Sequence, residues 1–259
     1  GRQMRYILWD SFHDAPFGLI GLQSPILKIS IRDRALNLPK EDLDIWVNKS
    51  LKAQRVGALP PYNQLIGGKM VALSLSSNKI RNDYFNKYKD RKTIIEERKL
   101  PATLLWISTT SAFGRSSLYN RLKFKDEDVA ISLGYTKGAG SFHIPDSIYE
   151  KIITLLEDND IDTSRGYGQG PSRKLKLISQ GLELLGLEDF QYHHLKREYY
   201  LFPLVKNLEE VINNDEEPLH FNRPFEELLN FWKDRWGLPR SKRRPEWKHF
   251  TAKEFLENK

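Results

Sequence analysis

A chain of 259 residues with 39% hydrophobic content can form one large domain or two small ones. The absence of cysteine excludes disulfides, thiolate nucleophiles and cysteine-ligated metals. No apolar run approaches the roughly 20 residues of a membrane-spanning helix, and no signal-peptide pattern is visible, so we expect a soluble, cytoplasmic protein. The net charge is +7, and much of the basic excess lies near the C-terminus.

The first half of the chain predicts a hairpin followed by alternating helices and strands. Residues 4–25 alternate apolar positions around a polar, proline-containing break, which predicts two antiparallel strands. A proline and two acids at residues 39–42 resemble a helix start, and an apolar stripe predicts that this helix continues to about Gln54. A short strand over residues 55–59 and a helix from about Leu65 follow.

The second half continues in the same mixed order. A continuous apolar run predicts a buried strand over residues 99–109, and a short helix over residues 115–122 comes next. We expect two strands within residues 129–136 and 140–145. Further elements are helices at 146–159 and 174–186, a strand at 197–205 and charged helices that include residues 224–236.

This order predicts an α/β (α+β) fold class in which helices flank a mixed sheet. We expect a core over residues 1–210 and a basic, tryptophan-containing helical extension over residues 211–259. The chain begins abruptly at Gly1 in a strand-like segment, which suggests a fragment or a processed chain.

The segment "PPYNQLIGGK" is the first candidate site. A strand, a glycine-containing turn and a helix start can point backbone N–H groups at a phosphate, and a lysine adds charge. The alternative is that small residues at a helix start serve close packing, because short glycine patterns are weak evidence. The candidate cofactor-binding residues are Gln64, Gly67, Gly68 and Lys69.

Two isolated polar groups are candidates for acid–base or anion chemistry. Asp33 lies between Arg32 and Arg34, a trio that can orient a substrate or bind phosphate but is more commonly a surface salt bridge. His143 at the end of a predicted strand is a candidate base, although a lone histidine is more often structural. No histidine has metal-site spacing and no "GxSxG" elbow is present, so we predict neither a metal site nor a serine hydrolase.

Basic residues interleaved with tryptophans at residues 235–248 suit a phosphate backbone and stacked bases. The alternative is a solvated helix end whose tryptophan packs into the core. If DNA is the partner, hydroxyl and basic groups of the segment 109–121 would contribute as well. The candidate nucleic-acid-binding residues are Thr109, Thr110, Ser111, Arg115, Ser116, Ser117, Asn120, Arg121, Lys137, Arg240, Arg243 and Arg244.

The segment "ISTTSAFGRSSLYNRLKF", placed after "QLIGGK", resembles the Gcn5-related N-acetyltransferase fold. This resemblance implies an acyl-CoA whose pyrophosphate lies at Gly67 to Lys69, with Tyr119 as the acid that returns a proton to the CoA thiolate. Asp33 or His143 would be the base. The loop departs from the family pattern because Lys69 replaces a small residue. The alternative for Tyr119 is that it packs, with Leu122, the predicted helix onto the sheet.

Longer motifs resemble a second family. "GLIGLQSPILKISIRD", "GALPPYNQLIGGKMVAL", "TTSAFGRSSLYNRLK", "GYTKGAGSFHIPD" and "RWGLPRSKRRPEW" are similar to the DruA family of the Druantia anti-phage system, over nearly the whole chain. The resemblance implies a bacterial defence protein with other defence proteins as partners and a further N-terminal portion. Two functions stay open: an acyltransferase-like enzyme acting on nucleic acid or protein, and a non-catalytic DNA-binding subunit.

Overall fold

The computed structural model describes residues 1–93, 97–138, 140, 143–164, 173–188, 190 and 192–257. The chain forms two compact units. Unit 1 comprises Gly1–Tyr135 and Glu198–Lys259, and unit 2 comprises Thr136–Arg197. Among the described residues no helix is both long and apolar enough to span a bilayer.

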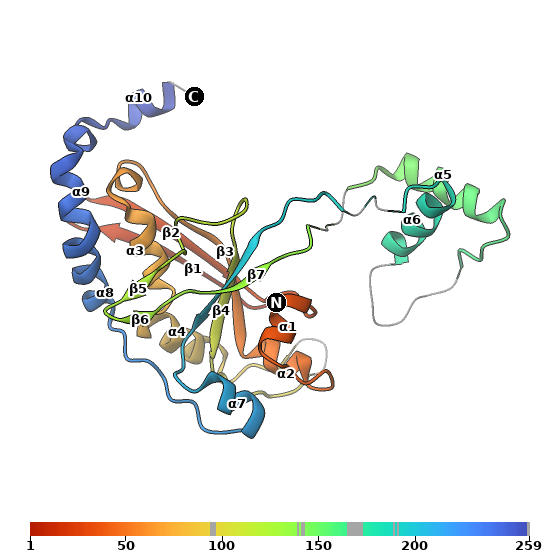
Figure 1. The fold of residues 1–259 in the computed structure, drawn as a ribbon, viewed down its shortest axis with the longest axis horizontal. Coiled ribbons are helices and arrows are strands. Elements are labelled where there is room, and N and C mark those ends of the chain that lie inside the picture. The colour runs from red at the N-terminus through yellow and green to blue at the C-terminus, as the bar shows by residue number, and fades with distance from the viewer. Residues whose placement is uncertain are drawn as a thin grey trace. The chain divides into compact units, whose positions relative to one another are not determined.

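Unit 1 is built on a mixed sheet whose strand order is β1-β2-β3-β4-β8-β7 (Figure 1). The strands β1 (Gln3–Asp10), β2 (Ala15–Gln23) and β3 (Ser50–Ala58) pair antiparallel. On the other side, β8 (Glu198–Pro203) pairs antiparallel with both β4 (Trp106–Thr110) and β7 (Ile131–Tyr135). The predicted hairpin and the predicted mixed sheet flanked by helices are therefore confirmed.

The two halves of this sheet join through a short parallel pairing of β3 with β4. It extends only over residues 50–52 of β3 and residues 106–108 of β4. Beyond it, the Thr109 hydroxyl donates a hydrogen bond to the Ala53 carbonyl at 2.9 Å, while β3 continues to Ala58. The two strands therefore share few ladder bonds.

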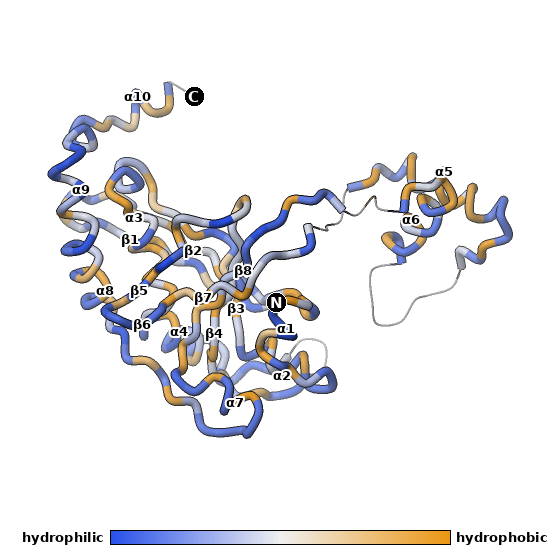
Figure 2. The backbone as a smooth tube through the Cα atoms, viewed as in Figure 1, coloured by the Kyte–Doolittle hydropathy of each residue, from blue (hydrophilic) through white to orange (hydrophobic). Residues whose placement is uncertain are grey.

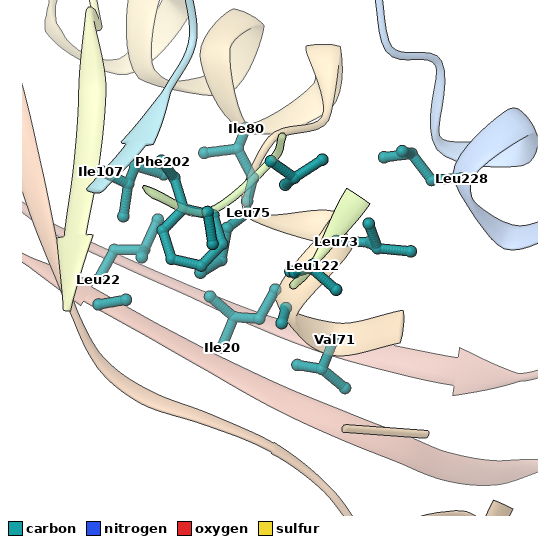
Figure 3. Packing of buried hydrophobic residues seen from close by; sticks show 14 of the residues in the cluster. Ile20, Leu22, Val71, Leu73, Leu75, Ile80, Ile107, Leu122, Phe202 and Leu228 are labelled. Atoms are coloured by element: carbon teal, nitrogen blue, oxygen red, sulfur yellow. The ribbon is translucent and has the colours of Figure 1, made fainter. Parts of the chain in front are cut away.

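The main core lies between one face of the sheet and the helices α3 (Gly67–Ser74), α4 (Asn78–Tyr88) and α8 (Phe225–Trp232). Figure 3 shows Ile20 and Leu22 of β2 and Phe202 of β8 converging with Val71, Leu73 and Leu75, which lie in or just after α3. Strand alternation places successive side chains on opposite faces, so Ile107 enters this core and Trp106 does not.

The opposite face of β4 and β8 carries a second core. Trp106 and Leu201 pack there with Trp46 of α2 (Leu43–Asn48) and Val211 of α7 (Leu208–Asn214). The short helix α1 (Ser30–Ala35) contacts β7.

The remaining elements of unit 1 are short. A 3₁₀ turn, η1 (Tyr62–Leu65), precedes α3, and a small hairpin pairs β5 (Lys123–Phe124) with β6 (Glu127–Asp128). After α8 the chain continues through a π-helical turn, η2 (Lys233–Gly237), and α9 (Leu238–Arg243). A 3₁₀ turn, η3 (Pro245–His249), and α10 (Ala252–Glu257) follow.

Unit 2 is a pair of helices with a small core of its own. α5 (Asp146–Glu157) and α6 (Arg173–Leu184) confirm the two helices predicted from their apolar periodicity. Ile152, Leu156, Leu177 and Ile178 form the core. The helices approach closely at Gly181, where an added methyl group would lie 2.5 Å from the Ile152 side chain.

Three local predictions were wrong or incomplete. The helix predicted over residues 115–122 is a series of turns, because Gly114 and Arg121 adopt left-handed φ angles of 43° and 53° that interrupt it. The helix expected to reach Gln54 ends at Asn48, and β3 begins at Ser50 because the sheet buries this segment. Part of the strand predicted at 140–145 lies outside the described residues, and residues 143–145 form no strand.

Candidate functional site

The loop of residues 111–121 leaves the end of β4 and presents an exposed tip. Its start is fixed: the Ser111 N–H donates to the Glu198 carbonyl, and the Glu198 N–H donates to the Ser111 hydroxyl, both at 2.9 Å. The following residues 112–115 are exposed, with Phe113 72% accessible. A large aromatic side chain this exposed is available to stack on a ligand rather than to stabilise the core.

The second half of this 111–121 loop is held against α3. Asn120 N–H donates to the Ser116 carbonyl at 2.9 Å, which closes one turn. The Lys69 ammonium reaches the carbonyl oxygens of Leu118 and Asn120, each at 3.4 Å. The two sequence segments that predicted a common site, "QLIGGK" and "SSLYNR", therefore lie in contact.

A buried carboxylate lies beneath the loop. Glu198 is only 4% exposed, and its carboxylate accepts hydrogen bonds from the Ser132 hydroxyl at 2.6 Å and from the Tyr200 hydroxyl. Burial, followed by the hydrogen bond to Glu198, raises the pKa of Tyr200 to about 12, so Tyr200 remains a proton donor at neutral pH. Neither Glu198 nor Tyr200 was predicted from the sequence, although an acid at the start of an apolar strand is an available signal.

Arg115 connects this carboxylate with the loop surface. Its guanidinium lies 4.0 Å from the Glu198 carboxylate and donates to the Asn120 side-chain oxygen at 2.9 Å. The side chain is nevertheless 60% exposed. Arg115 is thus oriented by its neighbours while most of its surface can still contact an anion.

Lys69 also contacts the C-terminal helices. Its ammonium lies 5.5 Å from the centroid of the Trp236 ring, and the Arg235 guanidinium lies 5.3 Å from the same ring. Burial, and to a smaller extent the charge of Arg235, lowers the pKa of Lys69. The Trp236 ring therefore contacts two cations, as aromatic rings commonly do.

The α9 basic segment consists of Arg240, Lys242, Arg243 and Arg244. Arg240 donates to the Gln64 carbonyl at 3.1 Å, which attaches α9 to the turn before α3. The other three side chains are exposed, and Figure 2 colours most of α9 as hydrophilic. The predicted alternative of a tryptophan packed against the core also holds in part, because Trp236 and Trp247 pack against the main core.

Close packing explains both glycines at the start of α3. A methyl group at Gly67 would lie 2.6 Å from the Tyr62 carbonyl oxygen and 3.0 Å from the Phe17 ring. One at Gly68 would lie 2.9 Å from the Leu118 side chain. The Trp232 indole N–H donates to the Ile66 carbonyl at 3.1 Å, so C-terminal helices cover this turn. The contacts give these glycines a role that requires no phosphate.

The three predicted acid–base residues have different surroundings. Tyr119 is 6% exposed and packs on Tyr200 and Phe202, and burial raises its pKa against the opposing effect of a hydrogen bond with Thr109. Asp33 accepts hydrogen bonds from the buried Arg32 guanidinium and from the Ile29 N–H. His143 is exposed and belongs to unit 2. The structure does not gather these residues within one unit.

The predicted nucleic-acid-binding residues divide by exposure. Thr109 and Ser111 are buried, with their hydroxyls bonded to protein carbonyls, while Ser117, Arg121 and Lys137 are exposed. Thr110, Ser116 and Asn120 are partly exposed, and the Ser116 hydroxyl accepts the Leu118 N–H at 3.2 Å. No group of three His, Asp or Glu side chains among the described residues is close enough to hold a metal ion.

These features define a class: an α+β protein with a mixed sheet, in which a lysine of α3 contacts both a basic, aromatic-tipped loop and a tryptophan that precedes a basic C-terminal helix. Within that class, the chain belongs to the DruA family, whose model, described as Druantia protein DruA, matches residues 1–214. The family predicted from the sequence motifs is confirmed.

The chain is similar in sequence to a curated relative. The Druantia protein DruA of Escherichia coli (strain UMEA 4076-1) is 34% identical over 262 residues, which cover 99% of this chain and 65% of the relative. The chain therefore spans just under two thirds of the length of that relative. No solved structure matches the chain.

Proposed function

We propose that this chain is a DNA-binding component of a Druantia-type anti-phage defence system, acting together with other proteins of that system. The observation that carries the proposal is the contact of Lys69 with both the 111–121 loop and Trp236, which joins two basic, aromatic-containing segments. Phosphates would bind the arginines, and a base would stack on the exposed Phe113.

The charge distribution supports the same proposal. Unit 2 contains eight basic and nine acidic residues, which leaves 33 basic and 25 acidic residues in unit 1. The positive charge of the chain therefore belongs to the unit that carries the loop and α9. Phosphate contacts supply most non-specific affinity for DNA, so the net positive charge of unit 1 favours this partner.

An acyl-CoA-dependent transferase is the second candidate. It is favoured by the short parallel β3–β4 pairing within otherwise antiparallel halves, with a glycine-containing helix start after β3. Tyr119 would hold the proton for the departing thiolate, and Asp33 or His143 would be the base. The packing of Gly67 and Gly68 does not favour a phosphate there, so we derive no catalytic step.

One titration separates the two candidates. The purified chain is heated with acetyl-CoA or with a short DNA duplex, and the melting temperature is followed as a function of ligand concentration. A ligand that binds the native state stabilises it by about 2.7 kcal/mol at a hundredfold excess over its Kd. We expect stabilisation by DNA and none by acetyl-CoA. Stabilisation by acetyl-CoA would favour the transferase instead.

A further inference from the structure

A pocket of about 310 Å³ opens in unit 1 and shares no lining residue with the candidate site. Four lining residues come from α4: Arg81, Asn82, Phe85 and Asn86. The chain at residues 102–104 and His220 complete the lining. A volume of this size is at the lower end of the range for small-molecule sites, about 300–1,000 Å³.

The four α4 residues lie on one helical face. Positions 81, 82, 85 and 86 are spaced one and four residues apart, which brings their side chains together on the helix surface. Phe85 is 52% exposed, although its ring lines a pocket. The carboxamides of Asn82 and Asn86 make no hydrogen bond to any residue that the structure describes. An aromatic face and two free amide groups are thus available together.

Arg81 supplies the positive charge of the described pocket lining. The Arg81 guanidinium donates through Nη1 to the Phe221 carbonyl at 2.9 Å, which fixes the side chain and leaves further N–H donors. The His220 Nδ1–H donates to the Leu204 carbonyl at 3.4 Å, and burial, followed by the charge of Arg81, lowers the pKa of His220. Neither aspartate nor glutamate is among the described residues that line the pocket, and the Lys89 ammonium lies 5.7 Å from the Phe85 ring. The pocket therefore favours a ligand with an anionic group.

We propose that this pocket binds a single nucleotide, with its phosphate on Arg81 and its base on Phe85 and the asparagine amides. Arg81 and Phe85 are about one helical turn apart, roughly 5–6 Å, which suits a phosphate and a base of the same nucleotide. An asparagine carboxamide can pair with the edge of adenine, and an aromatic ring stacks on any base. The nucleotide is either free or one unit of a DNA strand.

This proposal goes beyond the DNA contacts of the 111–121 loop and does not depend on them. The test measures binding of dAMP by calorimetry and of a fluorescent 15-nucleotide oligo(dA) by anisotropy. Asn86→Asp removes the amide N–H donor that would pair with the base and adds a negative charge to the pocket, and Phe85→Leu removes the stacking ring. Both side chains are exposed enough to change without unfolding the chain. The matched controls are Asn213→Asp on α7 and Phe12→Leu in the hairpin turn, both exposed and outside the pocket.

We expect both pocket variants to weaken nucleotide binding about tenfold or more, and both controls to leave it unchanged. If the pocket variants lose affinity for dAMP only, the ligand is a free nucleotide. If they lose affinity for oligo(dA) only, the ligand is one unit of a DNA strand. The proposal is overturned if neither affinity changes in the pocket variants. It is also overturned if inorganic phosphate displaces dAMP while Phe85→Leu has no effect, because the site would then bind a simple anion. If oligo(dA) binding is lost when the α9 basic segment is neutralised but not in the pocket variants, the result supports DNA binding by the 111–121 loop and α9 and not by the pocket.

Discussion

Neutralising the exposed end of α9 is expected to weaken DNA binding about a hundredfold at roughly 0.1 M salt. The variant is Lys242→Gln, Arg243→Gln and Arg244→Gln together, three exposed side chains of the α9 basic segment. Each lost phosphate contact removes about 0.9 from the slope of log affinity against log salt, so the slope should fall by about 3. Fluorescence anisotropy over a salt series measures both quantities.

A control with the same charge change separates location from net charge. Lys28, Arg34 and Lys40 are also exposed in unit 1, near α1. Their joint replacement by glutamine should change the affinity by no more than about threefold, because screening limits charges that do not contact the phosphates. Equal losses of DNA affinity in the two triple variants would show that the affinity depends only on the net charge of the protein. The proposed interface would then be wrong.

Gly67→Ala is expected to lower the free energy of unfolding of the ligand-free protein by about 2–3 kcal/mol. The added methyl group would lie 2.6 Å from the Tyr62 carbonyl oxygen, a backbone atom that cannot move without displacing η1. For a chain of this size the loss corresponds to a fall in melting temperature of about 5–10 °C. Calorimetry or circular dichroism of the purified variant measures it.

Alanine substitutions at two other glycines serve as controls for this result. A methyl group at Gly57 has no neighbour within 4 Å, so Gly57→Ala should change stability by less than about 1 kcal/mol. Gly68→Ala meets the end of the Leu118 side chain, which can rotate, and should have an intermediate effect. If Gly67→Ala is as stable as Gly57→Ala, packing does not explain Gly67, and a ligand at the start of α3 becomes the better explanation.

Periodicity in the sequence predicted the elements that depend on burial of one face. The hairpin of β1 and β2 alternates more and less buried positions, and α5 places Ile152 and Leu156 on one face. Both periodicities are present in the sequence, so both elements could be predicted from it. The segment 115–122 was misread because its apolar residues, including Leu118 and Leu122, mimic helical spacing. Left-handed φ angles at Gly114 and Arg121 depend on contacts with α3 and β8 that a local pattern does not contain.

The candidate site was predicted in part. The contact between Lys69 and the 111–121 loop followed from the order of two motifs in the chain. Glu198 and Tyr200 were missed because they belong to a strand that reads as an apolar run, and only the sheet order brings them beneath the loop. The α4 pocket was missed for a similar reason: Arg81, Asn82 and Asn86 look like an ordinary solvated face until His220 lies beside them.

Photo-crosslinking tests the central claim, that DNA binds the loop and the α9 basic segment, most directly. A duplex containing 5-bromodeoxyuridine is irradiated with the protein, and the crosslinked peptides are identified by mass spectrometry. We expect crosslinks in peptides containing Phe113, Trp236 or Trp247, aromatic residues within or beside the two basic segments. Crosslinks confined to unit 2, residues 136–197, or no DNA binding at low salt, would contradict the claim.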